Sequence, residues 1–90
     1  MDKTYRELER IVKGFANHRR VEILELLDKT PELSVIEISQ KTGSNFKTIS
    51  EHVRRLAISG LVVKRSAKSS VRHKLTDRGD IILKFLRTME

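Results

Sequence analysis

The spacing of apolar residues changes once along the chain, at Gly60, and this change limits the folds that the chain can adopt. Before Gly60, apolar residues recur every three or four positions, which is typical of amphipathic helices. After it, the β-prone runs LVVKR and VRHKL flank the small polar segment SAKSS, which predicts a hairpin. A further helical pattern follows Thr76. The predicted order is therefore four helices, a two-stranded hairpin and a last helix.

Capping signals place the ends of these elements. Asn17, Asn45 and Thr76 are suitable N-caps, and Gly43 stands where a C-terminal cap is expected. Gly79, near the start of the last helix, costs helix propensity and indicates close packing. The helices are predicted over about 2–14, 17–29, 35–41, 45–59 and 77–89, with the hairpin over about 61–75.

The size and composition of the chain indicate one small domain over residues 1–90. Its 90 residues, of which 38% are hydrophobic, suffice for one core but not for a separate catalytic or ligand-binding domain. The absence of cysteine excludes disulfides and thiolate metal sites. No signal peptide or membrane-spanning run is recognisable, so a soluble cytoplasmic protein is expected.

The net charge of +7 is concentrated in the second half of the chain. Between Lys41 and Lys74 there are nine Lys and Arg residues and a single acidic one, Glu51. A mixed-sign solvated surface does not have this pattern, whereas a surface that attracts polyanions does. Acidic protein or anionic membrane fits such a field, but nucleic acid is the commoner partner of a domain of this kind.

The fourth predicted helix has one narrow apolar stripe, formed by Ile49, Val53 and Leu56. These residues recur at i, i+4 and i+7 and would anchor the helix to a core. Its other face is polar and basic and would be free to enter a DNA major groove. Together with the preceding short helix and the turn at Gly43, this pattern is typical of a helix-turn-helix followed by a basic wing.

Three segments, FANHRRVEILELL, LSVIEISQKTG and NFKTISEHVRRLAISGLV, resemble the winged-helix repressors of the ArsR type, especially their compact archaeal relatives. The LTDRG segment resembles the junction between wing and last helix in such regulators. The resemblance implies a mainly α fold with a small β-hairpin wing (α+β), a winged helix-turn-helix. The chain departs from the family at Thr42 and Ser44, which are usually apolar. Without cysteine, and without histidine on the last helix, metal sensing of the family types is not expected.

Candidate DNA contacts come from the start and outer face of the fourth helix and from the hairpin. They are Asn45, Phe46, Lys47, Thr48, Ser50, Arg54, Arg55, Lys64, Arg65, Lys68, Arg72 and Lys74.

Several of these residues have a second interpretation. Phe46 either covers the polar turn or contacts a sugar or thymine methyl, and Thr48 either contacts phosphate or only starts the helix. Arg55 is a phosphate contact or a solvated charge rather than a base reader. The hairpin cations also suit an edge strand that avoids aggregation, but they exceed what that purpose needs. His52 and His73 are interpreted as structural histidines, and their spacing does not indicate a metal site.

The two terminal helices carry more apolar surface than a small core covers, which predicts a homodimer. The residues assigned to this interface are Tyr5, Leu8, Val12, Ile82, Phe85, Leu86 and Met89.

The expected function is sequence-specific binding of double-stranded DNA by a transcriptional regulator, with the fourth helix in the major groove. Two alternatives remain: a winged-helix module for protein interaction, and an architectural protein that binds DNA without sequence preference. No catalytic motif, metal site or cofactor motif is recognisable, so an enzyme is not expected. No small-molecule effector or membrane partner is indicated.

Overall fold

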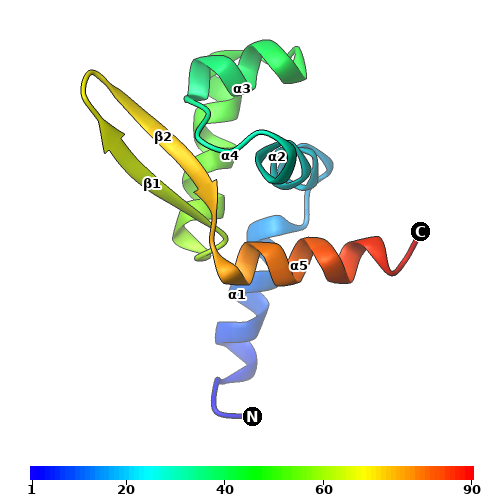
Figure 1. Cartoon of the computed structure of the whole chain (residues 1–90). Helices are drawn as coiled ribbons and strands as arrows, with labels where there is room; N and C mark the ends of the chain where they lie inside the picture. The colour runs from blue at the N-terminus through cyan, green and yellow to red at the C-terminus, as the bar shows by residue number, and fades with distance from the viewer.

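A computed structural model describes residues 1–90 and shows the predicted order of elements (Figure 1). Five helices and one antiparallel hairpin form a winged helix-turn-helix, so the predicted fold class is confirmed. No helix combines the length and the apolar character that crossing a membrane requires. The elements are α1 (Tyr5–Phe15), α2 (His18–Lys29), α3 (Val35–Thr42), α4 (Phe46–Ile58), β1 (Val62–Ala67), β2 (Ser70–Leu75) and α5 (Asp77–Arg87).

Helix α1 begins three residues later than predicted because a capping box fixes its start. The Thr4 hydroxyl accepts a hydrogen bond from the Glu7 amide at 3.1 Å, and the Glu7 carboxylate accepts one from the Thr4 amide at 3.0 Å. This reciprocal pair satisfies two amide groups that a helix start leaves free. Residues 2–4 therefore lie outside the helix. The predicted caps at Asn17, Asn45 and Thr76 are confirmed.

The strands of the hairpin extend further towards its tip than predicted, and the turn is tighter. Strand pairing runs from Val62 opposite Leu75 to Ala67 opposite Ser70, so most of the predicted SAKSS tip belongs to the strands. Only Lys68 and Ser69 form the turn, and Lys68 adopts the left-handed region with φ of 52°. Leu33 adds a one-residue bridge to His73 on the outer side of β2. The wing is thereby tied to the segment before α3.

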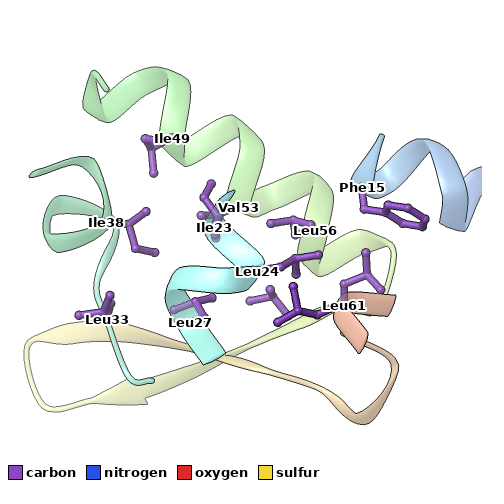
Figure 2. Close-up of a cluster of buried hydrophobic side chains, with 12 residues drawn as sticks. Phe15, Ile23, Leu24, Leu27, Leu33, Ile38, Ile49, Val53, Leu56 and Leu61 are labelled. Carbon is purple, nitrogen blue, oxygen red and sulfur yellow. The ribbon is translucent and has the colours of Figure 1, made fainter. Parts of the chain in front are cut away.

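A single apolar core joins all the helices and the base of the wing. Figure 2 shows α2 in its centre, with Ile23, Leu24 and Leu27 facing the side chains of α3 and α4. The predicted stripe of α4, formed by Ile49, Val53 and Leu56, is buried, and each of these residues is at most 1% exposed. The remaining buried apolar side chains are Phe15, Leu33, Ile38, Leu61, Val62 and Leu83.

Helices α1 and α5 lie at one end of the domain, and α3 and the tip of the wing lie at the other (Figure 1).

The junction between the wing and α5 is closely packed, as the glycine at position 79 indicated. A Cβ atom at Gly79 would overlap the carbonyl oxygen of Leu61. The Thr76 hydroxyl donates to the Gly60 carbonyl at 2.6 Å, which holds α5 against the end of α4. The helix-turn-helix and the terminal helices thus form one packed unit.

Candidate nucleic-acid interface

The turn between α3 and α4 sets the direction in which α4 presents its outer face. Helix α3 begins with a second capping box between Ser34 and Glu37, and it ends at Gly43, whose φ of 69° is left-handed. Glycine adopts this conformation without steric cost. Asn45 then starts α4, with its side-chain oxygen accepting from the Thr48 amide at 2.9 Å. Residues 45–48, at the capped start of α4, are exposed.

The outer face of α4 carries a second stripe opposite the buried one. Lys47, Glu51, Arg54 and Ile58 recur every three or four residues, and all four are exposed. Ser50 and Thr48 lie exposed on either flank of this stripe. Because the inner stripe anchors α4 in the core, the outer stripe is held at a fixed orientation. Such a helix can enter a major groove without unpacking the domain.

Glu51 holds the two arginines of this face. Arg54 donates to both carboxylate oxygens, at 2.9 and 2.7 Å, and Arg55 donates to one of them at 3.3 Å. The hydrogen bond from Arg54 is the main cause that lowers the pKa of Glu51 to about 2. Glu51 is therefore ionised at neutral pH and in mildly acidic solution. The only acidic residue between Lys41 and Lys74 thus neutralises part of the predicted DNA surface.

Two arginines of the wing are also paired with carboxylates. Arg65 donates to both carboxylate oxygens of Glu32 at 3.0–3.2 Å, and Arg72 donates to Glu37 at 2.8 Å and to the Glu32 carbonyl at 3.1 Å. The Arg65 contact lowers the pKa of Glu32, while hydrogen bonds from Ser34 are the main cause that lowers the pKa of Glu37. Arg65 and Arg72 face each other across the strands. They connect the wing to the start of α3.

The predicted wing and helix lysines differ from these arginines. Lys47, Lys64, Lys68 and Lys74 are exposed and take part in no ion pair. The eight basic residues among the twelve candidate DNA contacts therefore form two groups: four free lysines, and four arginines already held by Glu32, Glu37 or Glu51. Eleven of the twelve are exposed, and only Arg72 is half-buried. Phe46 has 54% of its surface exposed.

The structure places His73 in the core, as the structural interpretation predicts. Its exposed fraction is 1%, and its Nδ1 lies 2.8 Å from the Leu33 carbonyl oxygen. A carbonyl only accepts, so Nδ1 carries the proton. Burial is the main cause that lowers the pKa of His73. His52 is half-buried, and burial and then the nearby Arg20 lower its pKa. No three His, Asp or Glu side chains meet in an arrangement that holds a metal ion.

The residues assigned to a dimer interface divide into two sets. Tyr5, Val12, Phe85 and Met89 are 52–85% exposed. Leu8 is half-buried, and Ile82 and Leu86 pack against the domain's own core. Ile81, which is not among the assigned residues, is 65% exposed. The unpaired apolar surface of α5 is therefore the face that carries Ile81 and Phe85.

Sequence reasoning missed the roles of Glu32 and Glu37. The Ser34–Glu37 spacing is a readable capping-box signal, but no local pattern connects Glu32 or Glu37 with arginines more than 30 residues away.

Comparisons with known proteins agree with this architecture. A family model described as winged helix-turn-helix DNA-binding matches residues 17–63. No curated protein sequence shows a significant match.

Solved structures resemble the chain over nearly its whole length. A homodimeric winged helix-turn-helix DNA-binding domain from Mycobacterium bovis, described as a possible ArsR-family transcriptional regulator, is 25% identical with a TM-score of 0.84, covering 98% of this chain and 87% of that one. HlyU from Vibrio cholerae is 29% identical with a TM-score of 0.82, covering 99% and 97%. The transcriptional regulator HlyU from Vibrio vulnificus is 30% identical with a TM-score of 0.75, covering 91% and 85%.

These matches confirm the resemblance seen in the sequence. The family model spans more than half of the chain, including α2, α3, α4 and the start of β1. The structural neighbours are transcription regulators. The chain belongs to the winged helix-turn-helix DNA-binding family.

Proposed function

We propose that the chain is a sequence-specific, homodimeric regulator of transcription that binds double-stranded DNA. The observation that carries this proposal is the anchored helix α4, whose buried stripe leaves Lys47, Ser50 and Arg54 on an exposed and oriented face. In the proposed complex these three residues read base edges in the major groove. The similarity to transcription regulators supports the same conclusion.

The remaining polar and basic candidates, apart from Arg65 and Arg72, would bind the DNA backbone. Asn45, Thr48 and Arg55 lie at the start and flank of α4, where phosphates pass a helix in the groove. The free lysines of the wing, Lys64, Lys68 and Lys74, supply charge to the backbone or the neighbouring minor groove. In this proposal Arg65 and Arg72 act mainly by holding the wing against α3, since their guanidinium groups are occupied by Glu32 and Glu37.

Selection of bound duplexes from a random pool tests this proposal most directly. Competition binding at several salt concentrations then compares the selected site with random duplexes. Lys47→Ala is expected to reduce the preference for the selected site by about tenfold or more. Lys68→Ala is expected to weaken both duplexes equally and to lower the salt slope by about 0.9. Equal affinity of the wild-type protein for all duplexes would identify an architectural binder, and absence of DNA binding would identify a protein-interaction module.

The proposed homodimer uses the exposed apolar residues of the two terminal helices: Tyr5, Val12, Ile81, Phe85 and Met89. Two-fold pairing of this end would set two α4 helices on one face of DNA, with half-sites ~34–36 Å apart. The Mycobacterium bovis domain is homodimeric, which supports this arrangement.

Light scattering of the free protein tests the dimer. Ile81→Glu combined with Phe85→Glu is expected to give a monomer, because both side chains are exposed and tolerate the change within the protomer. Ile36→Glu is the matched control, since Ile36 is a 56% exposed apolar residue on α3 at the other end of the domain. A wild-type monomer at tens of micromolar, or a double variant that remains dimeric, would show that the interface lies elsewhere.

A further inference from the structure

A groove of about 550 Å³ opens between α1, the C-terminal end of α4 and the start of α5. It borders the proposed DNA-reading face, because Arg54 and Arg55 of α4 line one of its edges. Only one of its eleven lining residues, Glu7, is acidic, and six are cationic. The cationic residues are Lys3, Arg10, Lys13, Arg54, Arg55 and Arg78.

The groove uses a face of α1 that the proposed dimer does not need. Lys3, Glu7, Arg10 and Gly14 recur every three or four residues along this face. At 3.6 residues per turn, Arg10 and Gly14 lie roughly half a turn away from Val12, which belongs to the apolar face. Pairing of α1 through its apolar face therefore leaves the groove open.

At the floor of the groove, α1 packs closely against the C-terminal end of α4. Gly14 is buried, and a Cβ atom there would overlap the side chain of Ser59 at the end of α4. Helix ends of this kind repel anions because their last carbonyl groups are free. Here Arg78 donates to the Ser59 carbonyl at 3.0 Å, and the Ser59 hydroxyl donates to the Arg55 carbonyl at 3.0 Å. Two of these carbonyl oxygens are thus already occupied by donors.

The six cations of the groove outnumber their anionic partners, because Arg54 and Arg55 share the single carboxylate of Glu51. The Glu7 carboxylate is engaged by the Thr4 amide, and neither Lys3 nor Arg10 forms an ion pair. Lys13 has only an exposed 3.6 Å contact with Glu9. By contrast, exposed lysines on α2 and α5 pair with carboxylates one turn away, as Lys84 does with Asp80 at 2.8 Å. The groove therefore carries more positive charge than its carboxylate partners neutralise.

We propose that this groove binds a small phosphorylated polyanion. Guanidinium groups match phosphate oxygens in a bidentate geometry, and Arg10, Arg54, Arg55 and Arg78 surround the space. The volume suits a small ligand. The apolar wall consists only of Ile11 and Ile58, with no aromatic ring on which a base would stack. The ligand is therefore recognised by its phosphates, as pyrophosphate or a comparable compact polyanion would be.

Occupancy of the groove would act on DNA binding, and this consequence rests on the proposed function. Arg54 and Arg55 belong to α4, and they are held by Glu51 rather than by the core. A polyanion in the groove would draw both guanidinium groups away from the outer face of α4. The ligand and DNA would then compete for the same two cations, so that each weakens binding of the other.

Calorimetric titration of the DNA-free protein with pyrophosphate tests the site itself. Arg10→Ala removes an unpaired cation of the groove, and Lys64→Ala removes an unpaired cation of the wing as the matched control. One saturable site is expected, with affinity at least about tenfold lower in Arg10→Ala and within about twofold of wild type in Lys64→Ala. Sulfate at the same ionic strength should not saturate the site. No saturable pyrophosphate binding, or an equal loss in both variants, would overturn the proposal.

Fluorescence anisotropy with a DNA duplex distinguishes a free polyanion from DNA phosphates, which offer the same chemistry. If the ligand is free, pyrophosphate releases DNA from the wild-type protein, whereas Arg10→Ala binds DNA normally and resists this release. If Arg10→Ala weakens DNA binding and no pyrophosphate site is found, the groove contacts the DNA backbone and the proposal is wrong. A protein that binds pyrophosphate but not DNA would refute the proposed function alone.

Discussion

Replacement of Glu51 by glutamine should increase binding to DNA of any sequence. Glu51 is the one carboxylate on the outer face of α4, and it holds Arg54 in a two-point contact and Arg55 in a third. Glutamine keeps the shape of the side chain but removes its charge. The two guanidinium groups would then be free to bind phosphates. The same change removes the repulsion between this carboxylate and the DNA backbone.

The expected magnitude comes from the number of arginines released. Each cation that neutralises a phosphate of B-DNA steepens the dependence of log K on log salt by about 0.9. Two released arginines therefore steepen the slope by up to about 1.8. At 0.1 M salt this corresponds to a gain of up to roughly eightfold per arginine for random DNA. The preference for the selected site should fall, because random duplexes gain at least as much as the specific one.

Anisotropy titrations of the wild-type and Glu51→Gln proteins at salt concentrations from about 50 to about 300 mM measure the slope of log K against log salt. Glu25→Gln is the control, because it removes a carboxylate from an exposed helical pair, Lys29 with Glu25, without freeing an arginine. Since the pKa of Glu51 is about 2, lowering the pH to 5 should not imitate the variant. A slope for Glu51→Gln equal to that of Glu25→Gln would refute the idea that Arg54 and Arg55 bind phosphate.

Three further predictions concern the fold and the wing. Gly79→Ala should lower the free energy of unfolding by ~1–3 kcal/mol in urea titrations, because the new Cβ overlaps the Leu61 carbonyl, and a neutral effect would contradict this packing. Arg72→Ala should accelerate amide hydrogen exchange in β1 and β2, whereas Lys68→Ala should not, because only Arg72 connects the wing to Glu37. Burial lowers the pKa of His73, so the unfolded chain takes up its proton first as the pH falls below about 6.5. The free energy of unfolding should therefore fall by up to about 1.4 kcal/mol per pH unit towards pH 5, and His73→Gln should reduce this slope; an unchanged slope would contradict the buried, neutral histidine.

Most of the fold follows from local signals. The helices and the hairpin were predictable because each has a clear hydrophobic period, and Asn17, Asn45 and Thr76 are strong caps. The start of α1 was misplaced although its signal is present in the chain. Thr4 followed by Glu7 is a capping box, and it places the helix start at Tyr5. The hairpin turn was misplaced for a different reason. Serine and alanine have no strong preference for a turn, so they join the strands where Ala67 pairs with Ser70.

The surface of α5 shows a limit of periodicity. Its apolar residues spread around the helix, so the sequence indicates an excess of apolar surface but not which part faces inward. That choice depends on the angle at which α5 docks, and the close contact between Gly79 and Leu61 sets this angle. Leu83 is consequently buried, Ile82 and Leu86 lie beside it, and Ile81 and Phe85 face away.

The charge of the candidate interface was predictable, but its distribution among free and paired groups was not. Counting charges treats Arg54, Arg65 and Lys68 alike, although only Lys68 is without a carboxylate partner. The partners Glu32 and Glu37 reach the wing only because Leu33 bridges to β2, a contact that spans 40 residues of sequence. An arginine held by a carboxylate has an oriented guanidinium group, but it must exchange that partner for a phosphate before it adds affinity. The lysines therefore supply the long-range attraction to DNA, and the paired arginines of α4 engage only where the groove brings phosphates or bases close enough to replace Glu51.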